Sequence, residues 1–407
     1  MITLFKLALR DLGRNRRRSF FSALALGLGL SLLLLMASVV EGEMRDALKA
    51  NILLQTGHLQ VQSQTYSEGK SSLAWEDLLE NPAAMAEQIA ALPPVQAVTP
   101  RLLANGIIST GDQSEGAQAM GIDPASPVND PFRLGVLSGE YLRADDREGL
   151  MVGKDLADKL KLQAGASVTL LVNTANGEVD QQPFIVRGIY STGFPGYDQS
   201  VILLPLAKAQ AITKTENHAS ILFILLKDQA QAGAVADALK TDLYQVKTWQ
   251  DMNALVVEFE KFAGAYMFFL YLIILGITAT VIVNTLIMAV FERTREIGIL
   301  AAMGMRGGKI MAMFFAESTF LAAGGILIGF LLGGLLVAYA NQVGFYVGNM
   351  GLSGGFLLGE RIYGYLTVKD AVTLTITAFV ITLLAGLYPA VLAARMEPVE
   401  ALRGGDK

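Results

Sequence analysis

The chain has 407 residues, of which 52% are hydrophobic and only 17% are charged, and its mean hydropathy is +0.43. A soluble protein usually carries about a quarter charged residues, so this composition indicates a membrane protein with a substantial water-soluble part. The net charge of −5 gives no basic field for nucleic acid. The absence of cysteine excludes disulfides, thiolate chemistry and cysteine-based zinc sites.

The N-terminal segment, residues 1–18, has an amphipathic pattern, with cations at intervals of four residues opposite an apolar side. We expect it to form an interfacial helix on the cytosolic membrane surface. Residues 19–40 contain no charge, and 22 residues are enough to cross a hydrocarbon core of ~30 Å. The cations before this span and the acids after it place the N-terminus in the cytosol. A cleaved signal peptide is the alternative, but its apolar region would usually be only about 7–15 residues long.

Residues 41–261 are polar, mixed and rich in turns, with short strand patterns alternating with amphipathic helix patterns. This predicts a large extracytoplasmic α+β domain of two lobes, with a β-rich insertion at about residues 127–205. The expected strands are His58–Ser63, Ile107–Thr110, Ala117–Ile122, Ser167–Val172, Phe184–Tyr190, Ser200–Leu204 and Ile221–Lys227. The expected helices are Pro82–Ala91, Lys154–Leu162 and Ala230–Leu243.

Three further apolar spans follow, at residues 262–291, 310–340 and 370–394. The first of these would be ~45 Å long as a helix, so we expect it to project beyond the bilayer. An extracytoplasmic glycine-rich loop at 341–369 and a cytosolic tail at 395–407 complete the expected division. Four spans return the C-terminus to the cytosol.

The third span carries Gly325, Gly329 and Gly333 at intervals of four residues. Small residues at this spacing let two helices approach closely in lipid, so we expect a helix-packing face here. Glu317, near one end of the same span, has no second acid or histidine beside it and is expected to be structural.

The candidate functional segment is the charged island at residues 292–309, which separates two long apolar runs. Glu292 and Glu296 stand four residues apart, with Arg293 and Arg295 beside them. Ile297, Leu300, Ala301 and Gly304 then recur at helical spacing, so a short helix would have one small, apolar side. Such a face suits insertion into a groove on a partner protein. The alternative is a positively charged loop that only fixes the topology.

The island, FERTREIGILAAMGM, resembles the ER.REIG.L.A.G segment of FtsX-like ABC transporter permeases, the group with MacB-type exporters and the LolC/LolE lipoprotein-releasing permeases. The resemblance extends to GIDPAS at 121–126, to the run at 150–170, to FIVRGIYSTG at 184–193 and to TWQDM at 248–252. It implies four transmembrane helices and a MacB-like periplasmic core domain between the first two. It also implies that the island is a coupling helix that docks on a cytosolic ATPase, with a match at Glu292, Arg293, Arg295, Glu296, Ile297, Gly298, Leu300, Ala302 and Gly304. With Ala301 taken from the helical spacing in place of Ala302, the expected coupling residues are Glu292, Arg293, Arg295, Glu296, Ile297, Gly298, Leu300, Ala301 and Gly304.

The resemblance further implies a permease in a bacterial inner membrane that works with two ATPase subunits and a second permease chain. The chain lacks a Walker A motif, because Gly307-Gly308-Lys309 is followed by Ile310, so ATP and Mg²⁺ would be bound by the partner ATPase and no cofactor by this chain. The expected function is extraction of lipoproteins from the membrane, with a periplasmic carrier or adaptor as a further partner. The alternatives are export of drugs, peptides or other amphiphiles, and an FtsX-like signalling anchor.

Overall fold

The computed structural model describes Arg10 and residues 16–67, 73–348, 352–353, 356–357 and 359–396. The expected interfacial helix at 1–18 and the tail at 395–407 lie largely outside these residues. The chain divides into two compact units, which we call the membrane unit (Met1–Met44, Glu260–Phe345 and Ile362–Lys407) and the sheet unit (Arg45–Phe259 and Tyr346–Arg361). Each is described by itself.

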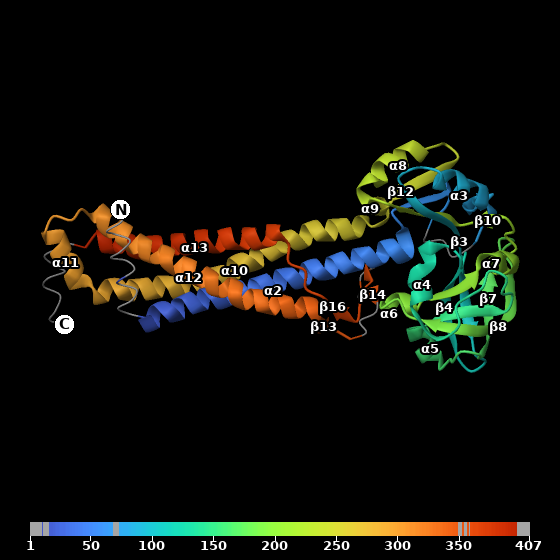
Figure 1. Cartoon of the computed structure of the whole chain (residues 1–407), viewed down its shortest axis with the longest axis horizontal. Coiled ribbons are helices and arrows are strands. Elements are labelled where there is room, and N and C mark those ends of the chain that lie inside the picture. Colours follow the sequence, from blue (N-terminus) through green and yellow to red (C-terminus); the bar gives the residue numbers. More distant parts are fainter. Residues whose placement is uncertain are drawn as a thin grey trace. The chain divides into compact units, whose positions relative to one another are not determined.

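Among the described residues, four helices are long and apolar enough to cross a membrane (Figure 1). They are α2 (Arg16–Asn51), α10 (Ala254–Glu292), α12 (Gly307–Gln342) and α13 (Val368–Ala394). Helices α2 and α10 continue well past the apolar runs, since the flanking sequences, including EGEMRDALKA, are also mostly good helix formers. Together with the α+β sheet unit described below, these helices confirm the predicted fold class.

The membrane unit is held together by close packing of α12 on α2. Gly325, Gly329 and Gly333 are buried on one side of α12. A Cβ atom added to them would lie 2.6, 2.9 and 2.9 Å from atoms of Leu26, Leu30 and Leu34 respectively. Only glycine leaves room for these leucine side chains, which also belong to the apolar core that α2 forms with α10, α12 and α13.

The sheet unit is built on one mixed sheet with strand order β12-β1-β11-β3-β4-β9-β6-β8-β5, and β7 pairs with β3 and β8. The strands are β1 (Leu59–Ser63), β3 (Val95–Ser109), β4 (Ser114–Ile122), β5 (Val136–Gly139), β6 (Gly149–Gly153), β7 (Ser167–Asn173), β8 (Val179–Tyr190), β9 (Val201–Pro205), β11 (Ile221–Leu226) and β12 (Tyr244–Thr248). Helices α3 (Pro82–Ala90) and α8 (Ala232–Leu239) cover the core beside β1 and β11. Helices α5 (Lys154–Leu160) and α7 (Leu206–Thr213) contribute to the core on β4, β6, β7, β8 and β9.

The long strand β3 belongs to two lobes. Its residues as far as Arg101 pair with β11, and its residues from Leu102 onward pair with β4. We call the part with β1, β11, β12 and Val95–Arg101 the first lobe, and the part with Leu102–Ser109 and β4 to β9 the second lobe. The second lobe therefore begins at Leu102, earlier than the insertion expected at 127–205, because β4 pairs with β3 on one side and with β9 on the other.

Shorter elements complete the structure. The helix α2 runs into the π-helix η1 (Ile52–Thr56), and α9 (Trp249–Met252) precedes α10. The segment between β4 and β6 holds η3 (Pro127–Asn129) and α4 (Asp130–Leu134), and α6 (Pro195–Asp198) precedes β9. In the expected glycine-rich loop, the short strands β14 (Leu352–Ser353) and β15 (Phe356–Leu357) pair with each other. Remaining short elements are η2 (Trp75–Asp77), β2 (Leu79–Glu80), β10 (His218–Ala219), η4 (Gln229–Gln231), β13 (Phe345–Tyr346) and β16 (Arg361–Ile362).

The glycine packing face predicts a position-specific effect of added side chains. Gly329→Val should destabilise the helix bundle by about 1–3 kcal/mol, because the new methyl groups overlap Leu30. Gly334→Val, in the same helix, has no atom within 4 Å of its added Cβ and serves as the matched control. Thermal unfolding of the two purified variants in detergent compares them, and equal loss of stability would contradict the packing role.

The half-buried environment of His58 predicts that the stability of the sheet unit depends on pH. Its Nδ1 accepts a hydrogen bond from the Leu226 backbone N–H at 2.8 Å, and burial lowers the pKa of His58 below its ordinary value of 6.5. As the pH falls below 6.5, the unfolded chain binds this proton before the folded chain does, so stability should decrease. His58→Asn keeps an acceptor near Nδ1 but does not titrate, and should flatten the dependence of the unfolding temperature between about pH 7 and about pH 5. If the pH dependence of the unfolding temperature is the same in His58→Asn, it arises from other titrating groups.

Candidate coupling site between α10 and α12

The predicted coupling segment forms the short helix α11 (Thr294–Ala302) between α10 and α12. The Thr294 hydroxyl donates to the Phe291 carbonyl at 2.8 Å, which joins the start of α11 to the end of α10. After α11, Gly304 has a φ of +89°, and Met305 N–H donates to the Leu300 carbonyl at 3.0 Å. Glycine adopts this left-handed conformation without strain, so it ends α11 and turns the chain into α12.

The apolar side of α11 packs against its own chain. Ile297 is 1% exposed, and Gly298 beside it is also buried. Ile297 belongs to a core formed with residues of α10, α12 and α13, namely Val290, Ile310, Met313, Phe314, Ala390 and Ala393, with Ala301 packed at its edge. Ile297, which we expected on the side that inserts into a partner, is therefore already buried by the ends of the chain's own helices.

The opposite side of α11 is the exposed one. Arg295, Ile299 and Met303 follow each other at intervals of four residues, and Ile299 and Met303 are 45% and 72% exposed. Glu296 and Ala302 are exposed beside them. We call these five residues the exposed face of α11. Ile299 and Met303 were not predicted from the sequence, although their spacing with Arg295 is the signal that would have grouped them.

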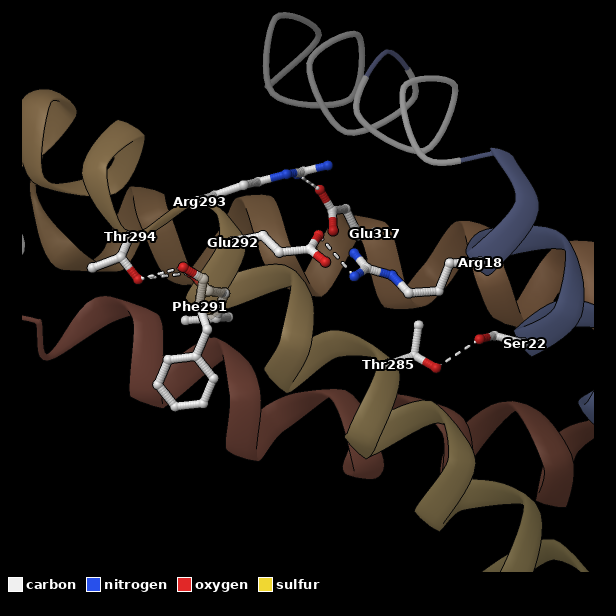
Figure 2. Close-up of polar contacts among 9 residues, drawn as sticks. Arg18, Ser22, Thr285, Phe291, Glu292, Arg293, Thr294 and Glu317 are labelled. Atoms are coloured by element: carbon white, nitrogen blue, oxygen red, sulfur yellow. Dashed lines mark hydrogen bonds and ion pairs between the residues drawn. The ribbon is translucent and has the colours of Figure 1, made fainter. Parts of the chain in front are cut away.

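A buried ion pair joins the start of α11 to α12. Arg293 Nη1 lies 2.7 Å from Glu317 Oε1, and the two side chains are only 7% and 3% exposed (Figure 2). Because both charges are removed from solvent, loss of either one would leave the other less well compensated. Glu317, which we expected to be structural, is thus the partner of a residue in the predicted coupling segment.

Two further polar contacts join α2 to α10 at the same end of the bundle. Arg18 Nη1 lies 2.8 Å from Glu292 Oε2, with both side chains partly exposed. Further along both helices, the Ser22 and Thr285 hydroxyl oxygens are 2.8 Å apart (Figure 2). The Thr285 hydroxyl also lies 2.8 Å from the Val281 carbonyl, to which it donates, so Ser22 is the donor between the helices. Residues of α2, α10 and α12 are therefore connected directly around the start of α11.

The nine predicted coupling residues thus divide by environment. Arg293, Ile297 and Gly298 are buried, Leu300 and Ala301 are half-buried, and Glu292, Arg295, Glu296 and Gly304 are exposed. Within the described part of the chain, no three histidine, aspartate or glutamate side chains gather as metal ligands would. What the site offers is a small mixed surface of charged and apolar side chains on a helix that is firmly attached to the membrane helices.

Residues 19–242 match the model of the MacB-like periplasmic core domain, and residues 268–398 match that of the FtsX-like permease C-terminal region. The chain belongs to the MacB-like periplasmic core domain family. This confirms the resemblance inferred from the coupling segment.

Several relatives match nearly the whole chain. It is 25% identical to the lipoprotein-releasing system transmembrane protein LolE of Haemophilus influenzae, over 94% of this chain and 93% of that protein. It is 26% identical to the LolC protein of Neisseria meningitidis over 98% of both chains. It is also 27% identical to the macrolide export ATP-binding/permease protein MacB of Rhodospirillum rubrum, over 98% of this chain but 59% of that protein.

The two ion pairs of the site should contribute very differently to stability. Glu317→Gln removes a carboxylate that is paired with the buried Arg293, and should cost about 3–5 kcal/mol of unfolding free energy. Glu292→Gln removes the partner of the partly exposed Arg18 and should cost at most about 1 kcal/mol. Chemical unfolding of the full chain in detergent measures both, and similar losses for the two variants would contradict the role given to burial.

Proposed function

We propose that the chain is the permease subunit of an ABC transporter that uses ATP hydrolysis by a separate cytosolic ATPase to release lipoproteins from the membrane. The observation that carries this proposal is the full-length likeness to lipoprotein-releasing membrane proteins, which covers 93–98% of those chains. The exposed face of α11 supplies a surface on which such an ATPase can dock.

Docking follows from the composition of this face. Ile299 and Met303 offer an apolar contact of adaptable shape, and Arg295 and Glu296 frame it with charges of both signs. A short amphipathic helix of this kind suits a groove on a partner protein, which helical anchors fill at this spacing. ATP and Mg²⁺ would bind to the ATPase, of which two copies serve two permease chains.

The internal contacts of the site support a mechanical role. When the ATPase subunits close, they would move α11, and the Arg293–Glu317 pair would pass that movement to α12. The Arg18–Glu292 and Ser22–Thr285 contacts would pass it to α2 and α10. Both α2 and α10 contribute residues to the sheet unit as well as to the membrane unit, so they form a covalent path between the two.

The proposed orientation places α11 and both termini in the cytosol and the sheet unit on the outer side of a bacterial inner membrane. Arg16, Arg17 and Arg18 precede the apolar part of α2, and Arg306 and Lys309 follow α11. Cations concentrate on the cytosolic side of membrane helices.

The second candidate function is export of macrolide-like or other amphiphilic compounds. It rests on the match of 98% of this chain to a macrolide export protein, of which the chain covers 59%. An FtsX-like signalling anchor is a third candidate, supported by the match of residues 268–398 to the FtsX-like permease C-terminal model. Stimulation of ATP hydrolysis by a triacylated lipoprotein, and not by a macrolide, distinguishes the first candidate from the other two.

Docking on the exposed face of α11 predicts that a substitution on this face weakens binding of the ATPase. Ile299→Asp should weaken binding of the ATPase by about 2 kcal/mol, roughly thirtyfold, because it places a charge at the centre of the contact. Leu243→Asp, an equally drastic change at an exposed leucine of the sheet unit, is the control and should bind normally. Co-purification and titration of the ATPase against the permease in nanodiscs measure this, and unchanged affinity of Ile299→Asp would move the docking surface elsewhere.

A further inference from the structure

Arg101 lies where the two lobes of the sheet unit meet. It is the last residue of β3 that pairs with β11, opposite Ile221, and the next residue, Leu102, is the first that pairs with β4. The side chain is 1% exposed and is the largest fully buried side chain of the described residues. A charged residue at this depth needs partners on every side.

The guanidinium group of Arg101 contacts three different parts of the sheet unit. Its carbon lies 3.8 Å from the ring centre of Phe223, on β11 of the first lobe. Its Nη2 donates to Asn129 Oδ1 at 3.1 Å, on η3 beside the second lobe, and Asn129 Nδ2 in turn donates to the Asp123 carbonyl at 2.9 Å. Its Nη1 donates to the Leu54 carbonyl at 2.7 Å.

The contact with Leu54 connects Arg101 to the end of the first membrane helix. Leu54 lies in the π-helix η1, which directly continues α2. Carbonyl groups in the last turn of a helix have no partner within the helix, and the negative end of its dipole attracts a cation. Arg101 supplies both the donor and the charge.

No carboxylate of the described residues forms an ion pair with Arg101. Burial lowers the pKa of Arg101 to about 10, so it remains charged at neutral pH. The compensation of this charge therefore depends on the carbonyl, the amide and the aromatic ring together. Movement of any one of the three away from the guanidinium would leave the charge less compensated, so the three positions are coupled through it.

The structure also leaves room beside this contact. A cavity of about 310 Å³ is lined by Leu54, Thr56, Arg101, Met120 and Tyr197, among others. In a close-packed interior, a group that moves pushes its neighbours as well. Beside a cavity, the end of a helix can shift without forcing its neighbours apart. η1 borders this cavity, and its Leu54 carbonyl accepts a short hydrogen bond from Arg101 Nη1 at 2.7 Å and a longer one from the Tyr197 hydroxyl at 3.5 Å.

We propose that Arg101 is the joint through which the end of the first membrane helix positions the two lobes of the sheet unit. This role rests on the proposed function and extends it, since it names the residue through which a movement of α2 would reach the two lobes. Arg101 acts as a positioning residue, through Leu54, Asn129 and Phe223. Without it, the lobes would no longer follow the helix.

The joint is tested by measuring the distance between the lobes in the full chain in lipid nanodiscs. The chain has no cysteine, so cysteines introduced at Leu243 and Val179 are the only sites for spin labels. Both positions are exposed, Leu243 beside the first lobe and Val179 in the second. Pulsed electron paramagnetic resonance gives the distribution of distances between them, first in the permease alone and then in its complex with the ATPase, with and without ATP.

Three variants separate the joint from general stability. Arg101→Lys keeps the charge but not the forked geometry, Asn129→Ala removes one acceptor, and Arg101→Met removes the charge. Thr99→Val is the matched control on the same strand, since Thr99 is buried and no described residue lies within hydrogen-bond distance of its hydroxyl. Removing an unsatisfied hydroxyl of unchanged shape is close to neutral.

The expected result is a narrow distance distribution in the unsubstituted chain and in Thr99→Val, and a broadened one in Arg101→Lys and Asn129→Ala. In the complex, ATP should shift this distance in the unsubstituted chain and in Thr99→Val. Most of that shift should be lost in Arg101→Lys and Asn129→Ala, while ATP hydrolysis continues. Folding of each variant is checked by thermal unfolding, and Arg101→Lys and Asn129→Ala decide the question if Arg101→Met does not fold.

Equal widths and equal ATP-dependent shifts in all variants would overturn the proposal. A chain that binds no ATPase would instead contradict the proposed function, and the widths measured in the permease alone would still decide whether Arg101 joins the lobes.

Discussion

The ion pair between Arg293 and Glu317 determines how the coupling segment is presented. Two charges that are 7% and 3% exposed are already desolvated, so separating them would lose their mutual attraction without restoring hydration, and the start of α11 is held on α12. Ile297 then packs into the apolar core at the ends of α10, α12 and α13. With that side buried, Arg295, Ile299 and Met303 are left facing outward. The surface proposed for ATPase docking is therefore a consequence of how α11 is attached.

Arg293 and Arg101 are both buried cations, and their charges are compensated in two different ways. Arg293 forms an ion pair with a carboxylate on a neighbouring helix, which makes a strong connection between those two elements. Arg101 is compensated by a backbone carbonyl, an amide and an aromatic ring from three different places. A charge shared in this way couples more elements and fixes each of them less strongly. The first arrangement suits the transfer of movement into the bundle, and the second suits its distribution between two lobes.

Much of the membrane part could be predicted from the sequence, because crossing lipid demands long uncharged runs and close helix packing demands small residues at regular spacing. Gly325, Gly329 and Gly333 carried that signal, and they contact Leu26, Leu30 and Leu34. The apolar side of α11 was also visible in the sequence. Its partner was not, since the same periodicity results whether a helix packs against its own chain or against another protein.

The sheet unit was harder to predict because strand pairing is not local. Only Ile107–Thr110 was recognised in β3, whose first half contains Pro100 and Arg101 and lacks a clean alternation of apolar and polar residues. That half is paired with β11, more than a hundred residues away. The position of the lobe boundary depends on this pairing. The contacts of Arg101 depend on it as well, so neither was accessible from sequence pattern.

The most direct measurement is ATP hydrolysis by the permease and its co-expressed ATPase in nanodiscs, with and without a triacylated lipoprotein. Release of a lipoprotein driven by a docked ATPase predicts that hydrolysis rises when the lipoprotein is present, and that this rise disappears when the exposed face of α11 is altered. A stable complex whose hydrolysis is the same with and without lipoprotein would contradict lipoprotein release. Failure to form a complex with an ABC ATPase would contradict the coupling role itself.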